Sequence, residues 1–414
     1  MTKPSRHIHD VIVVGGGPSG ATAANDLALA GRDVVLLDKA GRIKPCGGAI
    51  PPRAIRDFDI PDELLVAKIS SARMVSPSDR AVDMPIDGGY VGMVDREHFD
   101  EWLRERAAGN GAVRLKGTFK KLEYLEDGTI AVSFEPKGAS LNGERTTLFA
   151  RAVVGADGAK SAVGRQTVPD ADKMPFVFAY HEIVKSPEQT NDVFDGSRCD
   201  VYYQGKLSPD FYAWVFPHGS STSIGVGSAN KGFSLRGAVE DLREVTGTDA
   251  CQTIRGEGAP IPLKPLKRWD DGRGVLLAGD AAGVVAPASG EGIYYAMAGG
   301  RLAAETMQAF LQTGDARQLA QARKRFMKSH GRVFWVLGIM QKFWYTTDKR
   351  RERFVSMCAD PDVQRLTWEA YMNKELVRGN PMAHVRIFFK DMAHLLGLTP
   401  AAPDNGADLP ARKV

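Results

Sequence analysis

The sequence lacks the features of a secreted, zinc-binding or membrane-spanning protein. Its 414 residues include only four cysteines, none in a C-x-x-C pair, which excludes a disulfide framework and argues against a zinc module. The N-terminal stretch has no apolar core of a signal peptide, and no apolar run approaches the roughly 20 residues of a spanning helix. The eight histidines show no metal-ligand spacing, so no metal is predicted. We expect a cytoplasmic protein that does not cross a membrane.

A large excess of one charge is also missing. The chain has 54 basic and 50 acidic residues, a net charge of +4, whereas a nucleic-acid-binding protein normally concentrates positive charge on one face. We therefore expect no nucleic-acid partner. The apolar fraction of 43% and the charged fraction of 25% are typical of globular proteins, and the length corresponds to two or three domains.

The clearest pattern lies at the start of the chain. An apolar run at 11–14 predicts a buried parallel strand, and small residues from Ser19 to about Ala30 predict a helix that Gly31 ends. A second apolar run, 34–37, predicts the next strand. The segment therefore has the order and length of one β–α–β unit.

The first turn of this unit is rich in glycine. Gly15, Gly17 and Gly20 have the spacing that permits a tight turn, close approach of a pyrophosphate and close packing of the helix on the strand. The helix N-terminus then offers free N–H groups to the phosphates. An acid at the end of the second strand suits a ribose 2′-hydroxyl and would repel a 2′-phosphate, which favours FAD or NAD over NADP. The predicted cofactor contacts are Gly15, Gly17, Pro18, Ser19, Gly20, Asp38 and Lys39.

Two later turns combine an acid with glycine after an apolar strand. Asp280 follows the apolar run at 275–278, where a carboxylate suits the hydroxyls of a flavin. The glycines that follow would let a helix N-terminus approach the isoalloxazine ring. Either turn taken alone is equally compatible with an ordinary strand–helix connection. The predicted cofactor contacts in the two turns are Asp157, Gly279, Asp280, Gly290, Gly292 and Ile293.

Between these motifs the patterns predict loops, hairpins and one more helix. Residues 41–70 are rich in Gly and Pro and are predicted to be loops, and Asp95 is the predicted N-cap of a helix. From 113 to 156 the apolar period changes to two, and the turn dipeptides Asp127-Gly128 and Asn142-Gly143 predict antiparallel hairpins.

The remaining half of the chain predicts a second sheet and a helical end. Apolar and polar residues alternate over 175–265, which predicts antiparallel strands. After a short strand near 275, the chain is predicted to be helical to about residue 396. The polar, proline-containing end predicts disorder.

Taken together, the three motifs resemble the FAD-binding fold shared by aromatic hydroxylases, squalene epoxidase-type enzymes and geranylgeranyl reductases. Arg96 matches the arginine that begins a helix near the flavin in this fold. Cys46 and Gly47 lie in a segment, 44–52, that resembles the cysteine–glycine loop beside the flavin ring of geranylgeranyl reductases. The aromatic motif of the same group is matched by Pro209, Tyr212, Trp214, Phe216 and Pro217.

The chain is thereby identified as a member of the geranylgeranyl reductase family, most similar to the chlorophyll and bacteriochlorophyll enzymes. The resemblance implies an α/β (α+β) fold with a Rossmann-like FAD-binding domain of the aromatic-hydroxylase type, an antiparallel β-sheet substrate domain and a C-terminal helical region. The predicted boundaries are 1–70, 90–175 and 265–330 for the FAD-binding domain, 71–89 and 176–264 for the substrate domain, 331–396 for the helical region and 397–414 for a disordered tail.

The resemblance also implies a reaction. Such enzymes use FAD to saturate isolated double bonds of a geranylgeranyl group, giving phytyl, on a pigment ester or on geranylgeranyl diphosphate. No second glycine motif follows a strand, so no second dinucleotide-binding domain is expected. The resemblance implies NADPH as a transient donor, with reduced ferredoxin as the alternative. The aromatic motif is expected to line the prenyl slot. Cys46 and Tyr212 are the candidate proton donors, with His181 and His218 as alternatives.

Two other functions and one location remain open at this point. A flavin monooxygenase of the same fold and a non-catalytic prenyl-binding escort are the alternative functions. An aromatic segment, 334–345, followed by the basic residues 349–351, is compatible with a membrane-surface element or with a buried helix. The expected partners are the prenyl substrate, a membrane surface and other enzymes of pigment biosynthesis.

Overall fold

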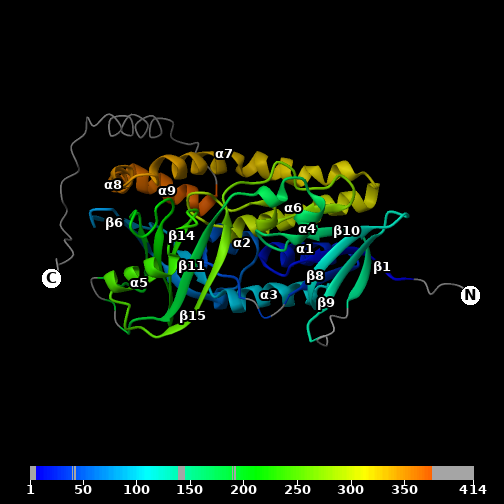
Figure 1. The fold of residues 1–414 in the computed structure, drawn as a ribbon, viewed down its shortest axis with the longest axis horizontal. Helices are drawn as coiled ribbons and strands as arrows, with labels where there is room; N and C mark the ends of the chain where they lie inside the picture. The colour runs from blue at the N-terminus through cyan, green and yellow to red at the C-terminus, as the bar shows by residue number, and fades with distance from the viewer. Residues whose placement is uncertain are drawn as a thin grey trace, which may run out of the picture. The chain divides into compact units, whose positions relative to one another are not determined.

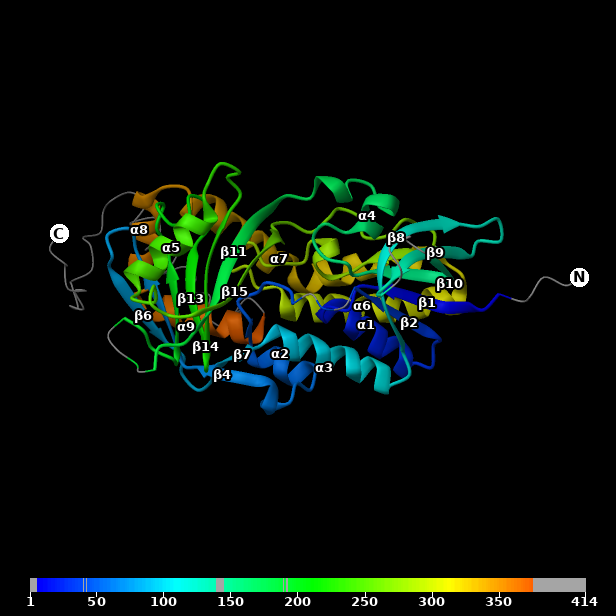
Figure 2. The ribbon, with the colours of Figure 1, turned by 60° about the horizontal axis from the view of Figure 1, so that its bottom comes forward.

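A computed structural model of the chain describes residues 6–39, 41, 43–138, 145–188, 190 and 193–374. These residues form two compact units, each made of three separate stretches. The first unit comprises Met1–Cys46, Arg96–Phe176 and Pro260–Phe334, and the second comprises Gly47–Asp95, Val177–Ala259 and Trp335–Val414. Figures 1 and 2 show the elements of both.

The first unit is built on a mixed sheet of six strands. Its strands are β1 (Ile8–Val14), β2 (Val34–Asp38), β8 (Val113–Tyr124), β9 (Ile130–Pro136), β10 (Thr146–Gly155) and β16 (Val275–Leu277). The central strand β1 pairs in parallel with β2 and β10, and β16 pairs in parallel with β10. Val11, Ile12 and Val13 are fully buried, as a strand covered on both faces requires.

Helices of the first unit pack around this sheet. They are α1 (Pro18–Leu29), α3 (Arg96–Gly109), α4 (Ala162–Thr167), α6 (Ile293–Thr313) and the first part of α7 (Ala320–Trp344), with short 3-10 turns η2 (Ala171–Lys173), η3 (Gly279–Ala282) and η4 (Ala316–Gln318). Helices α1 and α6 lie side by side (Figure 2). A Cβ added at Gly300 would lie only 2.2 Å from the carbonyl oxygen of Ser19, so this close approach requires glycine.

The second unit contains a seven-stranded sheet in the order β15-β11-β14-β13-β12-β5-β6. These strands are β15 (Thr253–Pro262), β11 (Phe176–Lys185), β14 (Ser221–Ser228), β13 (Ala213–His218), β12 (Arg198–Tyr202), β5 (Ser71–Val75) and β6 (Ala81–Pro85). The pair β12–β5 is parallel, whereas β11–β14, β14–β13, β13–β12 and β5–β6 are antiparallel. Helix α5 (Leu235–Val245) packs on β14 through Val239 and Leu242, which join one core with Val215 and Ile224.

A smaller sheet and the last helices complete the second unit. The sheet has the order β3 (Ala49–Ile50), β7 (Val91–Val94), β4 (Leu65–Ile69), and beside it lie α2 (Pro52–Asp57) and η1 (Asp62–Leu64). Helices α8 (Asp348–Met357) and α9 (Pro361–Asn373) follow α7. None of the helices in the described part of the chain is long and apolar enough to cross a membrane.

The structure confirms the predicted opening β–α–β unit, the helix after Asp95, and the Asp127-Gly128 turn between β8 and β9. The prediction that 41–70 is loop was wrong, because this range contains β3, α2 and β4. Strands of two and five residues are too short to show a period, and β4 is stabilised by pairing with the distant β7. The predicted Asn142-Gly143 turn, the helix beyond residue 374 and the disordered tail lie outside the described residues.

Candidate functional site

The glycine turn between β1 and α1 is held in the form that a dinucleotide needs. Gly15 has a φ of 108°, and a Cβ there would lie 2.3 Å from the Ala156 carbonyl oxygen. A Cβ at Gly20 would lie 1.8 Å from the carbonyl oxygen of Gly15, so the helix can pack this closely on the turn only with glycine at position 20. Gly17 is the N-cap of α1, and a Cβ there would meet nothing within 4 Å. Open space therefore lies where the helix presents its free N–H groups.

A buried hydroxyl near this turn supports the fit of a phosphate. Ser19 Oγ has no hydrogen-bond partner among the described residues, although the side chain is buried. A buried, unsatisfied hydroxyl is costly and normally indicates a missing partner. Gly279, with a φ of 64°, lies against Ser19, since a Cβ there would be 2.6 Å from the Cβ of Ser19. The first and the third glycine motifs therefore meet at Ser19, as one bound FAD would require.

The predicted ribose acid ends β2 next to the same turn. The Asp38 carboxylate lies 3.7 Å from the Arg104 guanidinium, which also donates to the carbonyl oxygen of Gly16 at 3.1 Å. A Cβ at Gly16 would lie 2.8 Å from the Asp38 carboxyl carbon, so this acid borders the turn directly. The following residue, Lys39, is exposed. No local pattern indicates Arg104, which lies 66 residues from Asp38 in the sequence.

The third motif places a carboxylate in the interior of the first unit. Asp280 lies in η3 after β16, is 8% exposed, and forms an ion pair with Lys44. Gly290 has a φ of 64°, and Gly292 is the N-cap from which α6 begins at Ile293. These are the features expected of a helix N-terminus that can approach a flavin ring.

The second predicted acid, Asp157, has a local structural partner. Its carboxylate accepts hydrogen bonds from the Ser161 hydroxyl and from the backbone N–H groups of Ala162, at 2.6 Å, and Val163, at 3.1 Å. It therefore satisfies the free N–H groups at the start of α4. Burial raises the pKa of Asp157, and these hydrogen bonds oppose that rise. The residue lies one position after Ala156, which contacts Gly15.

Arg96 is buried and held in a fork by an acid one turn along α3. Its Nε and Nη2 donate to the two Asp100 carboxylate oxygens at 2.8 and 2.7 Å, and both side chains are less than a tenth exposed. An arginine at the start of a helix is usually solvated, whereas this side chain is buried. Burial lowers the pKa of Arg96, but the Asp100 carboxylate and the Cys46 side chain raise this pKa by more than burial lowers it. The guanidinium therefore stays charged. The Cys46 thiol therefore lies beside a fixed positive charge.

In the second unit, the aromatic motif begins in the loop before β13 and continues along that strand. Tyr212 and Trp214 are less than a tenth exposed, with ring centroids 6.0 Å apart, and Trp214 and Phe216 are 6.2 Å apart. A Cβ at Gly47 would lie 3.0 Å from the Phe216 ring, so the residue after Cys46 packs directly on this ring. Pro217, the next residue, is buried.

A polar chain orients Trp214. The Trp214 Nε1–H donates to Ser223 Oγ at 3.1 Å, and His181 Nδ1 lies 2.9 Å from the same oxygen. On its other side, His181 Nε2 is 3.5 Å from the Glu257 carboxylate. This arrangement holds His181 behind the aromatic strand as a positioning group. The sequence did not identify Ser223 or Glu257, which lie on other strands.

The remaining candidate histidine is buried and uncharged at neutral pH. Burial lowers the pKa of His218 to about 4, although its Nδ1 contacts the Phe216 carbonyl oxygen at 2.9 Å. A Cβ at Gly48, whose φ is 71°, would lie 2.4 Å from His218 Nε2. His218 therefore packs under the loop at Gly48 and does not carry an acidic proton at pH 7.

Pro209, the first residue of the aromatic motif, is held in place by a buried arginine. Arg351, 2% exposed, donates to the carbonyl oxygens of Ser208, at 3.1 Å, Pro209 and Tyr345, and forms an ion pair with Asp348 at 2.6 Å. For Arg351, the burial agrees with the buried-helix alternative and not with a membrane-facing basic group. Its charge is used to hold the loop that leads to Tyr212.

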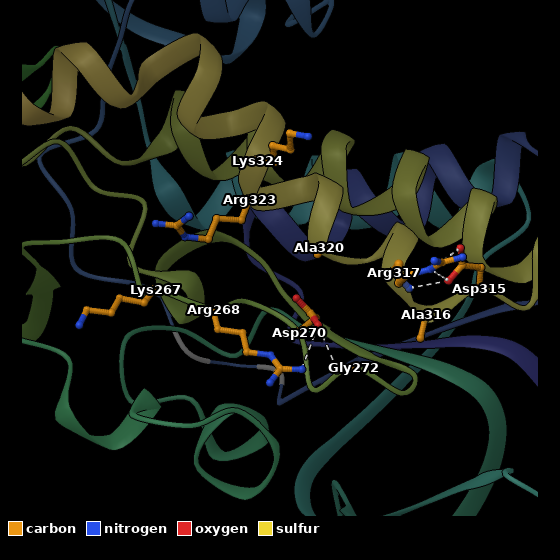
Figure 3. A pocket seen from close by; sticks show the side chains of 10 residues that line it. All are labelled: Lys267, Arg268, Asp270, Gly272, Asp315, Ala316, Arg317, Ala320, Arg323 and Lys324. Carbon is orange, nitrogen blue, oxygen red and sulfur yellow. Dashed lines mark hydrogen bonds and ion pairs between the residues drawn. The ribbon is translucent and has the colours of Figure 1, made fainter.

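The first unit also contains a cavity of about 480 Å³. Half of the residues that line it are basic, and Figure 3 shows Arg268 beside Asp270 and Arg317 beside Asp315. The residues that line it are Lys267, Arg268, Asp270, Gly272, Asp315, Ala316, Arg317, Ala320, Arg323 and Lys324. None of these belongs to the glycine and acid motifs, so this cavity is separate from the residues predicted to hold the flavin.

Comparison with known proteins shows the family to which this chain belongs. The model of a family described as "FAD binding domain" matches residues 9–329. A geranylgeranyl diphosphate reductase of Rhodobacter capsulatus is 58% identical over 392 residues, which cover 95% of this chain and 98% of that protein. One of Synechocystis is 36% identical, covering 95% and 99%. The crystal structure of a geranylgeranyl bacteriochlorophyll reductase-like protein of Thermoplasma acidophilum has a TM-score of 0.78 at 22% identity, covering 92% and 100%.

Proposed function

This chain belongs to the FAD-binding family and, within it, to the geranylgeranyl reductases, and we propose that it converts the geranylgeranyl group to phytyl with electrons from NADPH. It is an FAD-dependent reductase of geranylgeranyl groups. The observation that carries this conclusion is the 58% identity with a geranylgeranyl diphosphate reductase over 95% of the chain. The glycine turn, the open Gly17 position and the unpartnered Ser19 hydroxyl support FAD as the cofactor.

The reaction places particular demands on the protein. Saturating one isolated C=C bond adds a hydride to one carbon and a proton to the other, while NADPH is oxidised to NADP⁺. FAD, when bound and reduced by NADPH, would supply the hydride to the alkene carbon. The chain must hold the alkene close to the ring, exclude water that would trap positive charge on the alkene, and deliver the proton. The buried aromatic motif at β13 suits the exclusion of water because its rings are apolar, and the faces of such rings also attract positive charge.

Cys46 is the proton donor that we favour over Tyr212. The thiol lies beside Arg96, which is itself fixed by Asp100, so the thiol is held next to a buried and fixed group. His218 is excluded as a cationic donor by its lowered pKa of about 4. His181 contacts Ser223 and Glu257 and is better explained as a positioning group.

Replacing Cys46 by serine is expected to slow alkene reduction on the order of 100-fold, the usual contribution of a positioned general acid. FAD content should not change, because a serine hydroxyl also fits beside Arg96. The measurement is the rate of product formation together with the flavin absorbance of the purified variant. An unchanged rate would make Cys46 a structural residue, and the same change at the buried Cys199, in β12, serves as the control.

We propose that the protein binds its prenyl substrate at the surface of a membrane and that α7 contacts this surface. Within α7, Trp335 is 69% and Ile339 47% exposed, and residues four apart share one face of a helix. The exposed Arg332 and Lys342 flank them on the same side. Phe334, by contrast, is buried, so the membrane-facing part of the aromatic segment is this stripe from Arg332 to Lys342. Exposed aromatic and apolar side chains between cations are typical of helices that lie in the surface of an anionic bilayer.

The double replacement Trp335→Ala and Ile339→Ala is therefore expected to weaken binding to anionic vesicles about tenfold, since each side chain loses part of its 1.5–3 kcal/mol of apolar burial. Co-sedimentation with vesicles of phosphatidylglycerol and phosphatidylcholine measures the effect. Leu29→Ala, at a residue 64% exposed at the end of α1, is the matched control. Equal sedimentation of all three proteins would show that the stripe does not contact lipid.

The form in which the prenyl group arrives is tested by product analysis. The holoenzyme is given NADPH and either geranylgeranyl diphosphate or geranylgeranylated bacteriochlorophyll, and the products are weighed by mass spectrometry. Three reduced bonds add six hydrogens to the prenyl group and give phytyl. Turnover of one substrate identifies it, whereas an oxygenated product would favour the monooxygenase alternative. Turnover with reduced ferredoxin but not with NADPH would show that ferredoxin, and not NADPH, is the electron donor. A non-catalytic escort would give no product.

A further inference from the structure

Two histidines and one aspartate converge at the start of the first unit, away from the flavin motifs. His7 directly precedes β1 and His9 lies within it, so the two side chains, two residues apart, point to the same face of the strand. Asp33 directly precedes β2, and its carbonyl oxygen accepts from the N–H groups of Asp10 and Val11 at 3.0 and 3.2 Å. The backbone therefore fixes Asp33 beside the beginning of β1.

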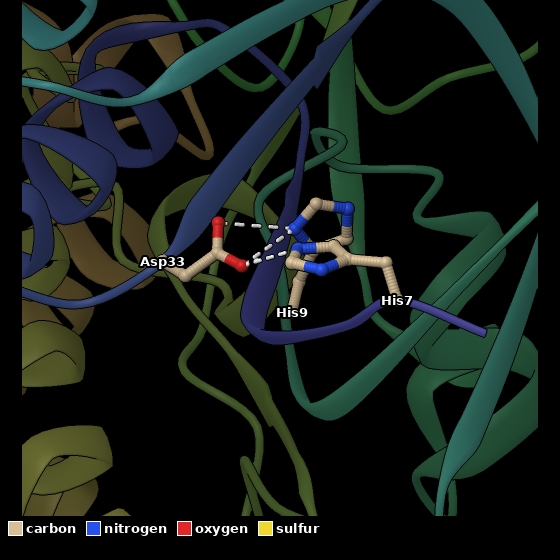
Figure 4. A group of neighbouring side chains, drawn as sticks. All are labelled: His7, His9 and Asp33. Carbon is tan, nitrogen blue, oxygen red and sulfur yellow. Dashed lines mark hydrogen bonds and ion pairs between the residues drawn. The ribbon is translucent and has the colours of Figure 1, made fainter. Parts of the chain in front are cut away.

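The three side chains bring their polar atoms to one point. His7 Nε2 lies 2.7 Å from Asp33 Oδ2, and His9 Nδ1 lies 3.0 Å from both carboxylate oxygens. One nitrogen from each ring and one carboxylate oxygen lie within 4.8 Å of one another. Figure 4 shows both rings turned toward the carboxylate.

The surroundings leave this group accessible. The His7 side chain is 71% exposed and that of Asp33 40%, so water can complete the shell of a bound ion. Among the described residues, the Asp33 carboxylate has no cationic partner other than the two imidazoles. The nearby Asp10 is already used, because its carboxylate accepts from the Asp33 N–H at 3.2 Å and pairs with Arg151 at 2.9 Å. Asp10 therefore orients Asp33 and is not needed as a ligand.

We propose that His7, His9 and Asp33 form a surface site for a divalent first-row transition ion of the Zn²⁺ class. Two imidazoles and one carboxylate are ligands that such ions prefer, whereas Mg²⁺ and Ca²⁺ prefer oxygen alone. Two neutral rings and one negative charge also balance part of the charge of a divalent cation.

The position of the site indicates its effect. His9 lies near one end of β1, while Gly15 follows the other end, about 20 Å away at 3.3 Å per residue. An ion there does not contact the flavin turn. It ties β1 to the residue that directly precedes β2, and an ion that binds only the folded chain raises its stability. The site is therefore structural and independent of turnover.

Titration calorimetry of the EDTA-treated, dialysed holoprotein with ZnCl₂ at neutral pH tests the proposal. We expect one strong equivalent, at least about tenfold weaker in His7→Gln and in His9→Gln, as loss of a ligand requires. His98→Gln, at a histidine on α3, should bind as the wild type does. Equal Zn²⁺ affinity in the wild type and the double variant H7Q/H9Q would overturn the proposal.

A second measurement identifies the ligands directly. With one equivalent of Cu²⁺, the electron paramagnetic resonance spectrum of the wild type should show coupling to two nitrogens, and that of His9→Gln to one. Melting followed by circular dichroism should show a higher midpoint with Zn²⁺ than with Mg²⁺ in the wild type, and the same midpoint for both ions in H7Q/H9Q. Unchanged nitrogen coupling in His9→Gln would contradict the assignment. His7 and His98 are exposed, whereas the His9 side chain is 14% exposed, and the same melting curves establish that the variants fold.

Discussion

Replacing Asp280 by alanine is expected to remove the flavin from the purified protein while the first unit stays folded. The carboxylate is buried, and Gly279 beside it touches Ser19 at the start of α1. Losing a hydrogen bond from a charged group costs about 1.5–3 kcal/mol, which corresponds to roughly 10- to 100-fold weaker FAD binding. Its partner Lys44 is 37% exposed and can be solvated when the acid is lost, so little stability should be lost.

The ratio of flavin absorbance to protein and the melting temperature measure these two effects separately. Asp26→Ala is the matched control, because Asp26 is an acid on α1 that pairs with Arg301 at 3.5 Å and lies outside the motifs. Asp280→Asn, which keeps the shape but not the charge, should give an intermediate flavin content. Full flavin content in Asp280→Ala would show that this turn is only a strand–helix connection.

Replacing Trp214 by alanine is expected to lower both the stability of the protein and its affinity for the prenyl substrate. Its ring is 6% exposed, so Trp214→Ala leaves a cavity and should cost about 3–5 kcal/mol of unfolding free energy. If the ring also lines the prenyl slot, the KM for the prenyl substrate should rise roughly 10- to 100-fold through lost apolar contact. Oxidation of NADPH by the flavin, without prenyl substrate, should remain near the wild-type rate.

A conservative variant separates packing from substrate contact. Trp214→Phe keeps most of the volume but loses the hydrogen bond from Nε1 to Ser223, so it should retain most of the stability and much of the substrate affinity. Unchanged KM in a folded Trp214→Ala protein would place Trp214 in the core alone. Equal loss of NADPH oxidation and prenyl turnover would likewise contradict a role at the slot.

The parts of the fold that could be predicted are those set by neighbouring residues. The first strand, helix and second strand follow from apolar runs and glycines within one short segment, and all three are present. Arg96 shows where such reasoning stops. Nothing local indicates that a charged side chain is buried, but Asp100, one helical turn away, supplies the compensating charge.

What could not be predicted depends on contacts between distant residues. The parallel pairing of β12 with β5 joins segments more than 120 residues apart, and β4 is stabilised by β7. The sequence left open whether Arg351 is exposed or buried, because two of the carbonyl groups that it binds, those of Ser208 and Pro209, lie more than 140 residues away. The His7, His9 and Asp33 group was missed because its third member lies 24 residues from His9.

The central claim is that this protein uses FAD to reduce isolated double bonds of a geranylgeranyl group. The most direct test is a single turnover without oxygen, in which the FAD-loaded protein is reduced with dithionite, freed of excess reductant and mixed with geranylgeranyl diphosphate or with the pigment ester. The claim predicts that the flavin absorbance returns as the prenyl group gains two hydrogens per flavin oxidised. Flavin that stays reduced with both substrates, or that is reoxidised while the prenyl mass is unchanged, would contradict it.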